Sequence, residues 1–131
     1  MWSTIFGYIA LNPDTDSVLG IQFYKHGETP GLGGEVEKQW FTDNFVNHPV
    51  KQQSGEIQYI PKRIRDNSGK IVSIKVVKGG VDYSESNNAS IHQVDGISGA
   101  TVTADGVTDF LLEDLLRYEK TLDKIRDYGT I

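Results

Sequence analysis

The chain has 131 residues and a formal net charge of -5, with 37% hydrophobic and 10% aromatic residues. This length predicts one domain over residues 1–131, and the acidic balance argues against nucleic acid as a partner, because phosphate backbones require basic surfaces. The absence of cysteine excludes disulfides, iron–sulfur clusters, thiolate zinc sites and thiol redox chemistry, but not an organic redox cofactor. No apolar run approaches the roughly 20 residues that span a bilayer, and no signal peptide is visible. We expect the abrupt start at Met1 to be an internal point of a longer protein.

The first elements in chain order form a predicted β-hairpin. Ile5 to Leu11 and Val18 to Tyr24 are rich in β-branched and aromatic residues, and the stretch NPDTDS between them is a turn-forming cluster. The alternation predicts that Leu19, Ile21 and Phe23 share one face.

A glycine-rich stretch, HGETPGLGGE, runs from His26 to Glu35. A short helix is predicted after it, over residues 35–45, ending before His48-Pro49 because the residue before proline disfavours helix. The apolar residues of this helix are Val36, Trp40 and Phe41.

Two further strands are predicted in the middle of the chain. Ile57 to Ile60 is the weaker one, and Lys70 to Val77 follows a turn at residues 66–69. The second strand alternates, with one face formed by Val72, Ile74 and Val76. The polar residues from Val81 to Gln93 are predicted to form a surface loop.

The last third is predicted to be helical, as one long helix or as two that break near Lys120-Thr121. One apolar stripe follows a period of 3.6 residues through Val107, Leu111, Leu115, Tyr118, Leu122 and Ile125. Together the elements predict an α+β fold, in which helices cover one face of an antiparallel sheet of at least four strands.

The small and hydroxyl residues of ISGATVTADGV, before the last helix, have two interpretations. In the first, Thr103 caps the helix and Asp105 lies in its first turn, where a carboxylate suits the helix dipole. In the second, the N–H groups of the helix start and the hydroxyls of Ser98, Thr101 and Thr103 hold an anion, most often a phosphate. Residues alone do not decide between these interpretations.

The same stretch resembles a known modification motif, D-x-x-[ST]-G-A-[ST]. The matching residues are Asp95, Gly96, Ile97, Ser98, Gly99, Ala100 and Thr101. In proteins with this motif an FMN is joined through its phosphate, by an ester, to the last hydroxyl, which is Thr101 here. The stretch HGETPGLGG and the order of the elements resemble the C subunit of the sodium-translocating NADH:quinone oxidoreductase over nearly the whole chain. Two features depart from that family: the N-terminal membrane helix is absent, and Val81–Gln93 matches nothing.

The resemblance implies an electron-transfer domain that carries covalent FMN on the periplasmic, outer face of a bacterial cytoplasmic membrane. Its partners would be the other subunits of a membrane complex that oxidises NADH, reduces quinone and exports sodium, and a flavin transferase that attaches the FMN. The membrane would be reached only through the absent helix. Two alternatives remain: the G subunit of the ferredoxin-linked relative of that complex, and a non-redox module that binds a phosphate or another anion.

The resemblance also implies which residues surround the flavin. Glu28, Thr29 and Leu32 are expected at the ring, with Gly31 and Gly33 permitting close approach of the backbone. The other residues expected at the cofactor are Lys78, Gly79, Ser98, Gly99, Ala100, Val102 and Thr103. Without the resemblance, HGETPGLGG is a loop that precedes a helix N-cap, and Lys78 is an exposed lysine at a strand end.

Acid–base and metal chemistry are not expected here. One-electron transfer needs no side chain as acid or base, so no catalytic residue is predicted, and the histidines are too scattered for a metal site. Asp14-Thr15-Asp16 lacks the rest of an EF-hand pattern and is predicted to be a hairpin turn. Asp95 is predicted to orient the motif for the transferase, with an Asx turn before Gly96 as the alternative.

Overall fold

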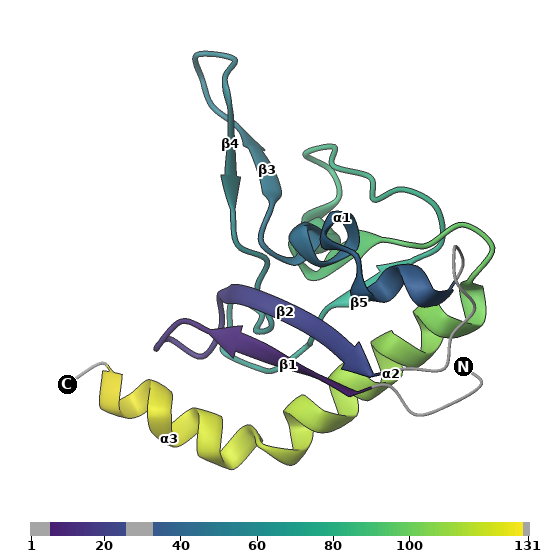
Figure 1. Cartoon of the computed structure of the whole chain (residues 1–131). Coiled ribbons are helices and arrows are strands. Elements are labelled where there is room, and N and C mark those ends of the chain that lie inside the picture. The colour runs from purple at the N-terminus through teal and green to yellow at the C-terminus, as the bar shows by residue number, and fades with distance from the viewer. Residues whose placement is uncertain (1–5, 26–32, 130–131) are drawn as a thin grey trace.

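The computed structural model describes residues 6–25 and 33–129 (Figure 1). Its elements in chain order, with η for 3-10 helices, are β1 (Phe6–Leu11), β2 (Val18–Lys25), η1 (Gly33–Glu37), α1 (Gln39–Thr42), η2 (Asp43–Phe45), β3 (His48–Lys51), β4 (Ile57–Ile60), β5 (Lys75–Val77), η3 (Asn88–His92), β6 (Gln93–Asp95), α2 (Thr101–Arg117) and α3 (Glu119–Gly129). None of the helices in these residues is both long and apolar enough to cross a membrane.

The predicted hairpin is confirmed as β1 and β2, which pair antiparallel. One side chain, that of Leu19, does not point to the predicted face. Ala10 is opposite Gly20 and Leu11 is opposite Val18, so Leu19 is the extra residue of a β-bulge. The bulge turns the Leu19 side chain outward, where it is 56% exposed, and Val18 is buried in its place. Ile21 and Phe23 belong to the core, as their alternation predicts.

The single helix predicted over residues 35–45 is wrong, because η1, α1 and η2 take its place. Lys38 has an extended backbone, with φ -78° and ψ 144°. This break in the helix changes which of the following side chains point toward the core. Phe41 and Phe45 therefore enter the core together, with ring centroids 5.6 Å apart. Trp40 is 48% exposed instead of buried, and its Nε1–H donates to Glu35 Oε2 at 2.7 Å.

The weaker strand at Ile57–Ile60 is confirmed as β4, and its partner β3 was not predicted. Pro49 lies in β3 opposite Tyr59. Proline has no N–H to donate and occurs in strands mainly at sheet edges, which is where a two-stranded ribbon places it. The hairpin projects from the body of the molecule (Figure 1), and every residue from 51 to 59 is exposed.

The strand predicted from Lys70 to Val77 is only three residues long, as β5. Ser73 has a φ of 62°, and its N–H and that of Val72 both donate to the carbonyl of Ile64. This turn interrupts the alternation, so Ser73 is buried and Val72 is exposed, while Ile74 stays in the core. The polar stretch after β5 is not wholly irregular, because it contains η3 and leads into β6, which pairs with β5 in parallel.

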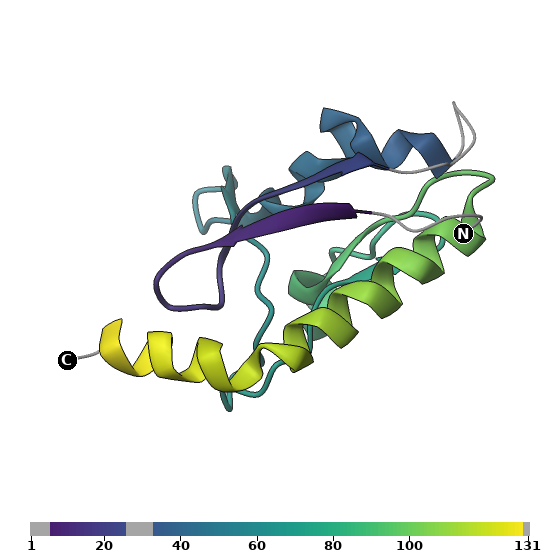
Figure 2. The same ribbon diagram turned by 60° about the horizontal axis from the view of Figure 1, so that its bottom comes forward.

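The C-terminal region forms two helices, the second of the two predicted arrangements, with the break at Tyr118. Figure 2 shows α2 running alongside the hairpin and the teal segment of β5, with α3 continuing beyond the turn. Val107 and Leu115 are buried, and Leu111 and Leu122 pack against the core. Two residues of the predicted stripe, Tyr118 and Ile125, are exposed instead, because the break at Tyr118 ends the period.

The α+β class is confirmed, but the expected sheet of four or more strands is not present among the described residues. Their strands form three two-stranded sheets, in the pairs β1–β2, β3–β4 and β5–β6. The last pair is parallel, so the fold is not purely antiparallel. One core joins the pairs β1–β2 and β5–β6, because residues from β2, η1, α1, β5, β6 and α2 all belong to it, and the β3–β4 pair contributes no residue to this core.

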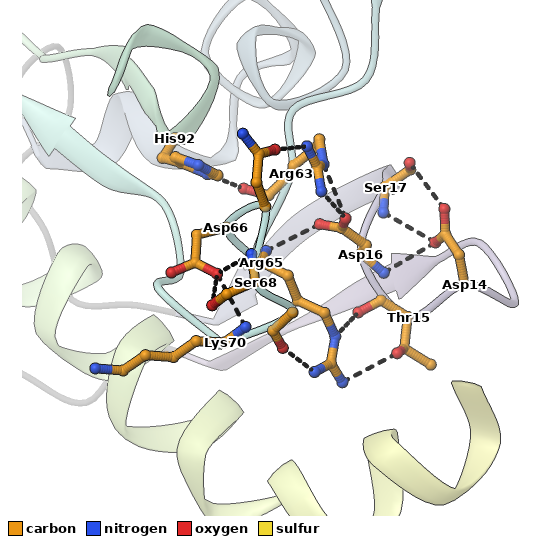
Figure 3. A network of polar contacts seen from close by, with 12 residues as sticks. Asp14, Thr15, Asp16, Ser17, Arg63, Arg65, Asp66, Ser68, Lys70 and His92 are labelled. Carbon is orange, nitrogen blue, oxygen red and sulfur yellow. Dashed lines mark hydrogen bonds and ion pairs between the residues drawn. The ribbon is translucent and has the colours of Figure 1, made fainter. Parts of the chain in front are cut away.

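The buried side chain of Arg65 connects the β1–β2 turn to other parts of the chain (Figure 3). Arg65 is 3% exposed. Its guanidinium donates to the carbonyl and hydroxyl oxygens of Thr15, each at 3.1 Å, to the carbonyl of Gly69 at 2.8 Å, and to Asp123 of α3 at 2.9 Å. Asp16 Oδ1 accepts the Arg65 main-chain N–H at 2.9 Å. The β1–β2 turn, the turn near Gly69 and α3 are thereby held together.

The stretch Asp14-Thr15-Asp16 is the hairpin turn that was predicted. Asp14 Oδ1 accepts the N–H groups of Asp16 and Ser17 at 2.9 and 3.0 Å, and Thr15 has a φ of 54°. Within the part of the chain that the structure describes, no group of three or more His, Asp or Glu side chains could hold a metal ion.

Candidate functional site

The motif residues 95–101 connect the end of β6 with the start of α2. Asp95 is the last residue of β6 and is opposite Val77 in the parallel pair. The chain then turns at residues 96–100, where the Ala100 N–H donates to the Ile97 carbonyl at 3.1 Å. Ile97 and Ala100 are buried, and Ser98 and Gly99 between them are exposed. The two buried residues fix the turn to the core, and the exposed pair forms its outer surface.

Asp95 joins the motif to the turn that follows β5. Its Oδ1 accepts the N–H of Val81 at 2.8 Å, and the N–H of Gly96 donates to the carbonyl of Gly79 at 3.1 Å. The carboxylate therefore bonds across to a neighbouring segment, and within the described residues it makes no bond of the Asx-turn type that was the alternative prediction. Lys78 and Gly79, which were predicted near the cofactor, are exposed residues of this same turn.

Two glycines of the motif meet definite steric requirements. A Cβ on Gly96 would lie 2.2 Å from the carbonyl oxygen of Val77, so only glycine allows β6 to continue so close to β5. Gly99 has a φ of 73°, in the left-handed region that favours glycine. The motif thus needs glycine at both positions for backbone reasons.

Thr101 is the first residue of α2, and its side chain is exposed. The predicted cap at Thr103 is wrong: the helix begins two residues earlier, Ala100 is the N-cap, and no side chain caps it. Thr103 lies in the first turn, where it is 5% exposed and faces the core with Ala104. Asp105 falls beyond the first turn, which holds no acidic residue. Val102 points outward and is exposed.

The start of α2 has the features that a phosphate group needs. The N–H groups of residues 101–103 precede the first intrahelical bond, which runs from the Ala104 N–H to the Ala100 carbonyl at 3.0 Å. These groups and the helix dipole favour an anion. The hydroxyl of Thr101 is accessible at the same place, while the buried Thr103 presents no such surface. A phosphate ester on Thr101 therefore fits the local structure.

The predicted flavin-contact residues Glu28, Thr29, Gly31 and Leu32 lie outside the described residues. Gly33, which was predicted with them, begins η1. Figures 1 and 2 both place η1 and the start of α2 at the same end of the molecule. The described chain thus places the end of the HGETPGLGG stretch near the end of the molecule where Thr101 lies.

A buried polar cluster close to the motif was missed at the level of sequence. Lys62 is completely buried, and its Nζ lies 2.9 Å from Tyr83 Oη, 3.2 Å from His48 Nδ1 and 3.3 Å from the carbonyl of Ser90. Burial lowers the pKa of Lys62 to about 8, and the negative charge of Asp95 opposes this shift. Burial and the neighbouring charge of Lys62 lower the pKa of His48 to about 4. No local pattern marks a lysine as buried, so the sequence offered no signal for this cluster.

Comparison with known proteins finds one matching family. Residues 1–113 match the sequence profile of the FMN-binding domain. The C subunit of the Na(+)-translocating NADH-quinone reductase of Pseudomonas aeruginosa is 38% identical over 111 residues, which are 85% of this chain and 36% of that protein. The protein of the same name from Vibrio vulnificus is 39% identical over 132 residues, covering 98% of this chain and 44% of its own length.

Two solved structures resemble the fold. The C subunit of the Na(+)-translocating NADH-quinone reductase from Parabacteroides distasonis superposes with a TM-score of 0.69 and 33% identity, over 93% of this chain and 51% of that one. NqrC of Shewanella oneidensis gives a TM-score of 0.71 and 30% identity, over 97% and 50%. The chain thus spans less than half of the curated relatives described above and about half of the solved chains.

Proposed function

Because this chain belongs to the family of FMN-binding domains, we propose that it carries FMN on Thr101 through a phosphate ester and transfers electrons. The observation that carries this proposal is the position of Thr101, an exposed hydroxyl at the first residue of α2. When bound, the flavin supplies the redox chemistry, and the protein supplies attachment, orientation and electrostatic tuning.

The attachment step needs an activated donor. The Thr101 oxygen bonds to phosphorus and loses its proton, while a phosphoric anhydride bond of a flavin dinucleotide breaks and a nucleoside monophosphate leaves. A flavin transferase performs this step on the accessible hydroxyl. The ester keeps one negative charge at the helix start, where such a charge contributes about 0.3–1 kcal/mol.

The residues around Thr101 would position the group. Gly99 and Ala100 let the backbone approach the phosphate, and the exposed Ser98 hydroxyl is available to it. Thr103 supplies its main-chain N–H, since its side chain is buried. Val102 is exposed beside the ester, and Glu28, Thr29, Gly31, Leu32 and Gly33 remain proposed contacts of the ring.

Lys78 is proposed to place its charge near the pyrimidine edge of the flavin, where reduction adds negative charge. It is exposed beside Gly79, which bonds to the motif at Gly96. Removing the cation disfavours the reduced flavin, so Lys78→Met should make the midpoint potential more negative. A redox titration with an unchanged midpoint would remove Lys78 from this role.

We place the domain in the C subunit of a Na(+)-translocating NADH-quinone reductase, on the outer face of the cytoplasmic membrane, with the other subunits as partners. The relatives from Pseudomonas aeruginosa and Vibrio vulnificus carry that name, which favours the NADH-linked complex over the ferredoxin-linked one. The chain by itself is expected to carry electrons and not to oxidise NADH, reduce quinone or move sodium.

The deciding experiment makes the protein together with a flavin transferase. The wild-type protein should fluoresce as a band on a denaturing gel and gain the mass of one FMN, and the Thr101→Val protein should lose both. Thr101→Ser keeps a hydroxyl and should be modified, as should Thr121→Val, which changes an exposed threonine on α3. Flavin retained by Thr101→Val would place the attachment elsewhere, and no modification of any variant would favour a non-redox module.

A further inference from the structure

The buried amino group of Lys62 has the number of partners that its charged form requires. An ammonium has three donors and no acceptor, and Nζ faces three acceptors: Tyr83 Oη, His48 Nδ1 and the carbonyl of Ser90. It also lies 4.6 Å from the centroid of the Tyr83 ring. In the described residues no carboxylate lies within ion-pair distance of it. The charge is therefore held by hydrogen bonds and a ring, not by a paired anion.

The neighbouring ionisable groups are arranged to accept from this ammonium. His48 of β3 is neutral at pH 7, because its pKa is lowered to about 4, so its Nδ1 can accept. Burial raises the pKa of Tyr83, from the 81–93 segment, and the phenol stays protonated. Asp95 of β6 acts on Lys62 through its negative charge, and His92 of η3 contributes electrostatically to the lowered pKa of His48.

Two of the three partners of Lys62, Tyr83 and Ser90, lie on the segment that joins the β5 turn to β6. Residues 81–92 form most of the connection from β5 to β6, and the N–H of Val81 at their start donates to Asp95 at 2.8 Å. Lys62 holds Tyr83, two residues after Val81, and Ser90, three residues before β6 begins. The main chain of Lys62 is itself fixed, since its N–H donates to Phe45 and its carbonyl accepts from Val18.

We propose that Lys62 is a positioning residue for the attachment of FMN at Thr101. It fixes the 81–92 segment, this segment supplies the Val81 N–H to the Asp95 carboxylate, and Asp95 begins the motif that ends at Thr101. Lys62 touches neither the hydroxyl nor the flavin and acts through these contacts. The inference rests on the proposed function. It assigns a role to the polar segment from Val81 to Gln93, for which the family resemblance offered no counterpart.

The charge of Lys62 makes this role dependent on pH. Loss of one proton turns the charge-assisted hydrogen bonds of Nζ into neutral ones, which are roughly half as strong, and removes the cation–π contact with the Tyr83 ring. The contacts of Lys62 with the 81–92 segment therefore weaken as the pH rises through about 8, the pKa of this group. His48 and Tyr83 do not titrate in this range, because their pKa values are shifted away from it in opposite directions.

The first test follows the Val81 amide in protein without flavin, by two-dimensional NMR. We expect its signal in the wild-type protein to shift with a midpoint near pH 8. The shift should be absent in Lys62→Met and present in Lys51→Met, which changes an exposed lysine of the β3–β4 hairpin. An identical titration of Val81 in Lys62→Met would overturn the link between Lys62 and Asp95, whatever the function of Thr101.

The second test measures the rate of FMN attachment by one transferase between pH 6.5 and 9.5. Lys62→Met should be modified about fivefold more slowly than wild type at pH 7, the size expected for one lost hydrogen bond, and Lys51→Met should not differ. The ratio of the wild-type to the Lys62→Met rate cancels the transferase's own pH dependence and should fall toward one above pH 8.

Tyr83→Phe serves as the second variant, because it removes only a hydroxyl from a partly exposed ring and leaves the core intact. Like Lys62→Met, it should lower the rate of FMN attachment relative to wild type. Wild-type protein that is modified on Thr101, with both variants equally fast at every pH, would contradict the role of Lys62 and leave the proposed function standing. Wild-type protein that is never modified would contradict the proposed function instead.

Discussion

At the scale of the residue, backbone proximity decides which positions of the motif can change. Gly96 lies against the carbonyl of Val77, and the Thr101 hydroxyl stands in the open at the helix start. These two residues are five positions apart, but their requirements are opposite. Gly96 must leave space for the neighbouring strand β5, and Thr101 must be accessible to an enzyme. The turn between them satisfies both because Ile97 and Ala100 are anchored in the core.

Gly96→Ala should therefore destabilise the fold by about 3 kcal/mol, because overpacking against a backbone atom cannot be relieved by a rotamer change. It should also slow FMN attachment, since β6 must shift away from β5. Urea denaturation measures the first effect. Gly80→Ala is the matched control, because its Cβ would meet only Asp95 Oδ1, at 4.0 Å, and a loss above about 0.5 kcal/mol there would contradict the steric explanation.

At the scale of the element, a hydroxyl of α2 bonds to the backbone of β5, beside the core packing that the two elements share. Thr108 Oγ1 accepts the N–H of Val76 at 2.9 Å and donates to the Ala104 carbonyl at 3.0 Å. The bond gives the Val76 N–H an acceptor and connects the middle of α2 to β5. Thr101, at the start of α2, lies on the same helix.

Thr108→Val has nearly the same shape but leaves the partly buried Val76 N–H without its acceptor, so it should cost about 1–3 kcal/mol of stability. Thr108→Ser keeps the hydroxyl and should cost less. Thermal unfolding of the three proteins provides the comparison. Equal stability of Thr108→Val and wild type would show that water replaces the hydroxyl at this site.

At the scale of the whole molecule, the burial of His48 makes stability depend on pH. The folded pKa of about 4 lies below the ordinary value of 6.5, so the unfolded chain binds more protons between these values. The stabilisation is complete above pH 6.5 and is lost as the pH falls toward 4, by at most about 3 kcal/mol. The lowered pKa values of Asp66 and Asp82 act only below their ordinary 3.8.

The measurement is the free energy of unfolding from pH 7 to 4, for wild type and for His48→Gln, whose amide oxygen can still accept from Lys62. The difference between the two proteins should change by about 1–3 kcal/mol over this range. A constant difference would mean that His48 has the same pKa in the folded and unfolded protein, which would contradict the lowering of its pKa by burial.

The sequence by itself determined the features that depend on local pattern. Turn residues separate the two strands of the hairpin β1–β2, period-3.6 spacing marks the C-terminal helices, and the motif at Asp95 to Thr101 pointed to the family that the comparisons confirm. These signals are local because β-pairing across a tight turn, helical faces and short motifs each lie within a few neighbouring residues.

Only the tertiary structure decided the rest, because long-range contacts override local preference. The extended Lys38 and the left-handed Ser73 broke a helix and a strand that their patterns favoured, since Phe41, Phe45 and Ile74 had to reach one core. Lys62 is a charged residue that local pattern places on the surface, but it is buried in the fold. Its burial is possible because His48 and Ser90 supply hydrogen-bond acceptors to its amino group, and they lie 14 and 28 positions from it in the chain.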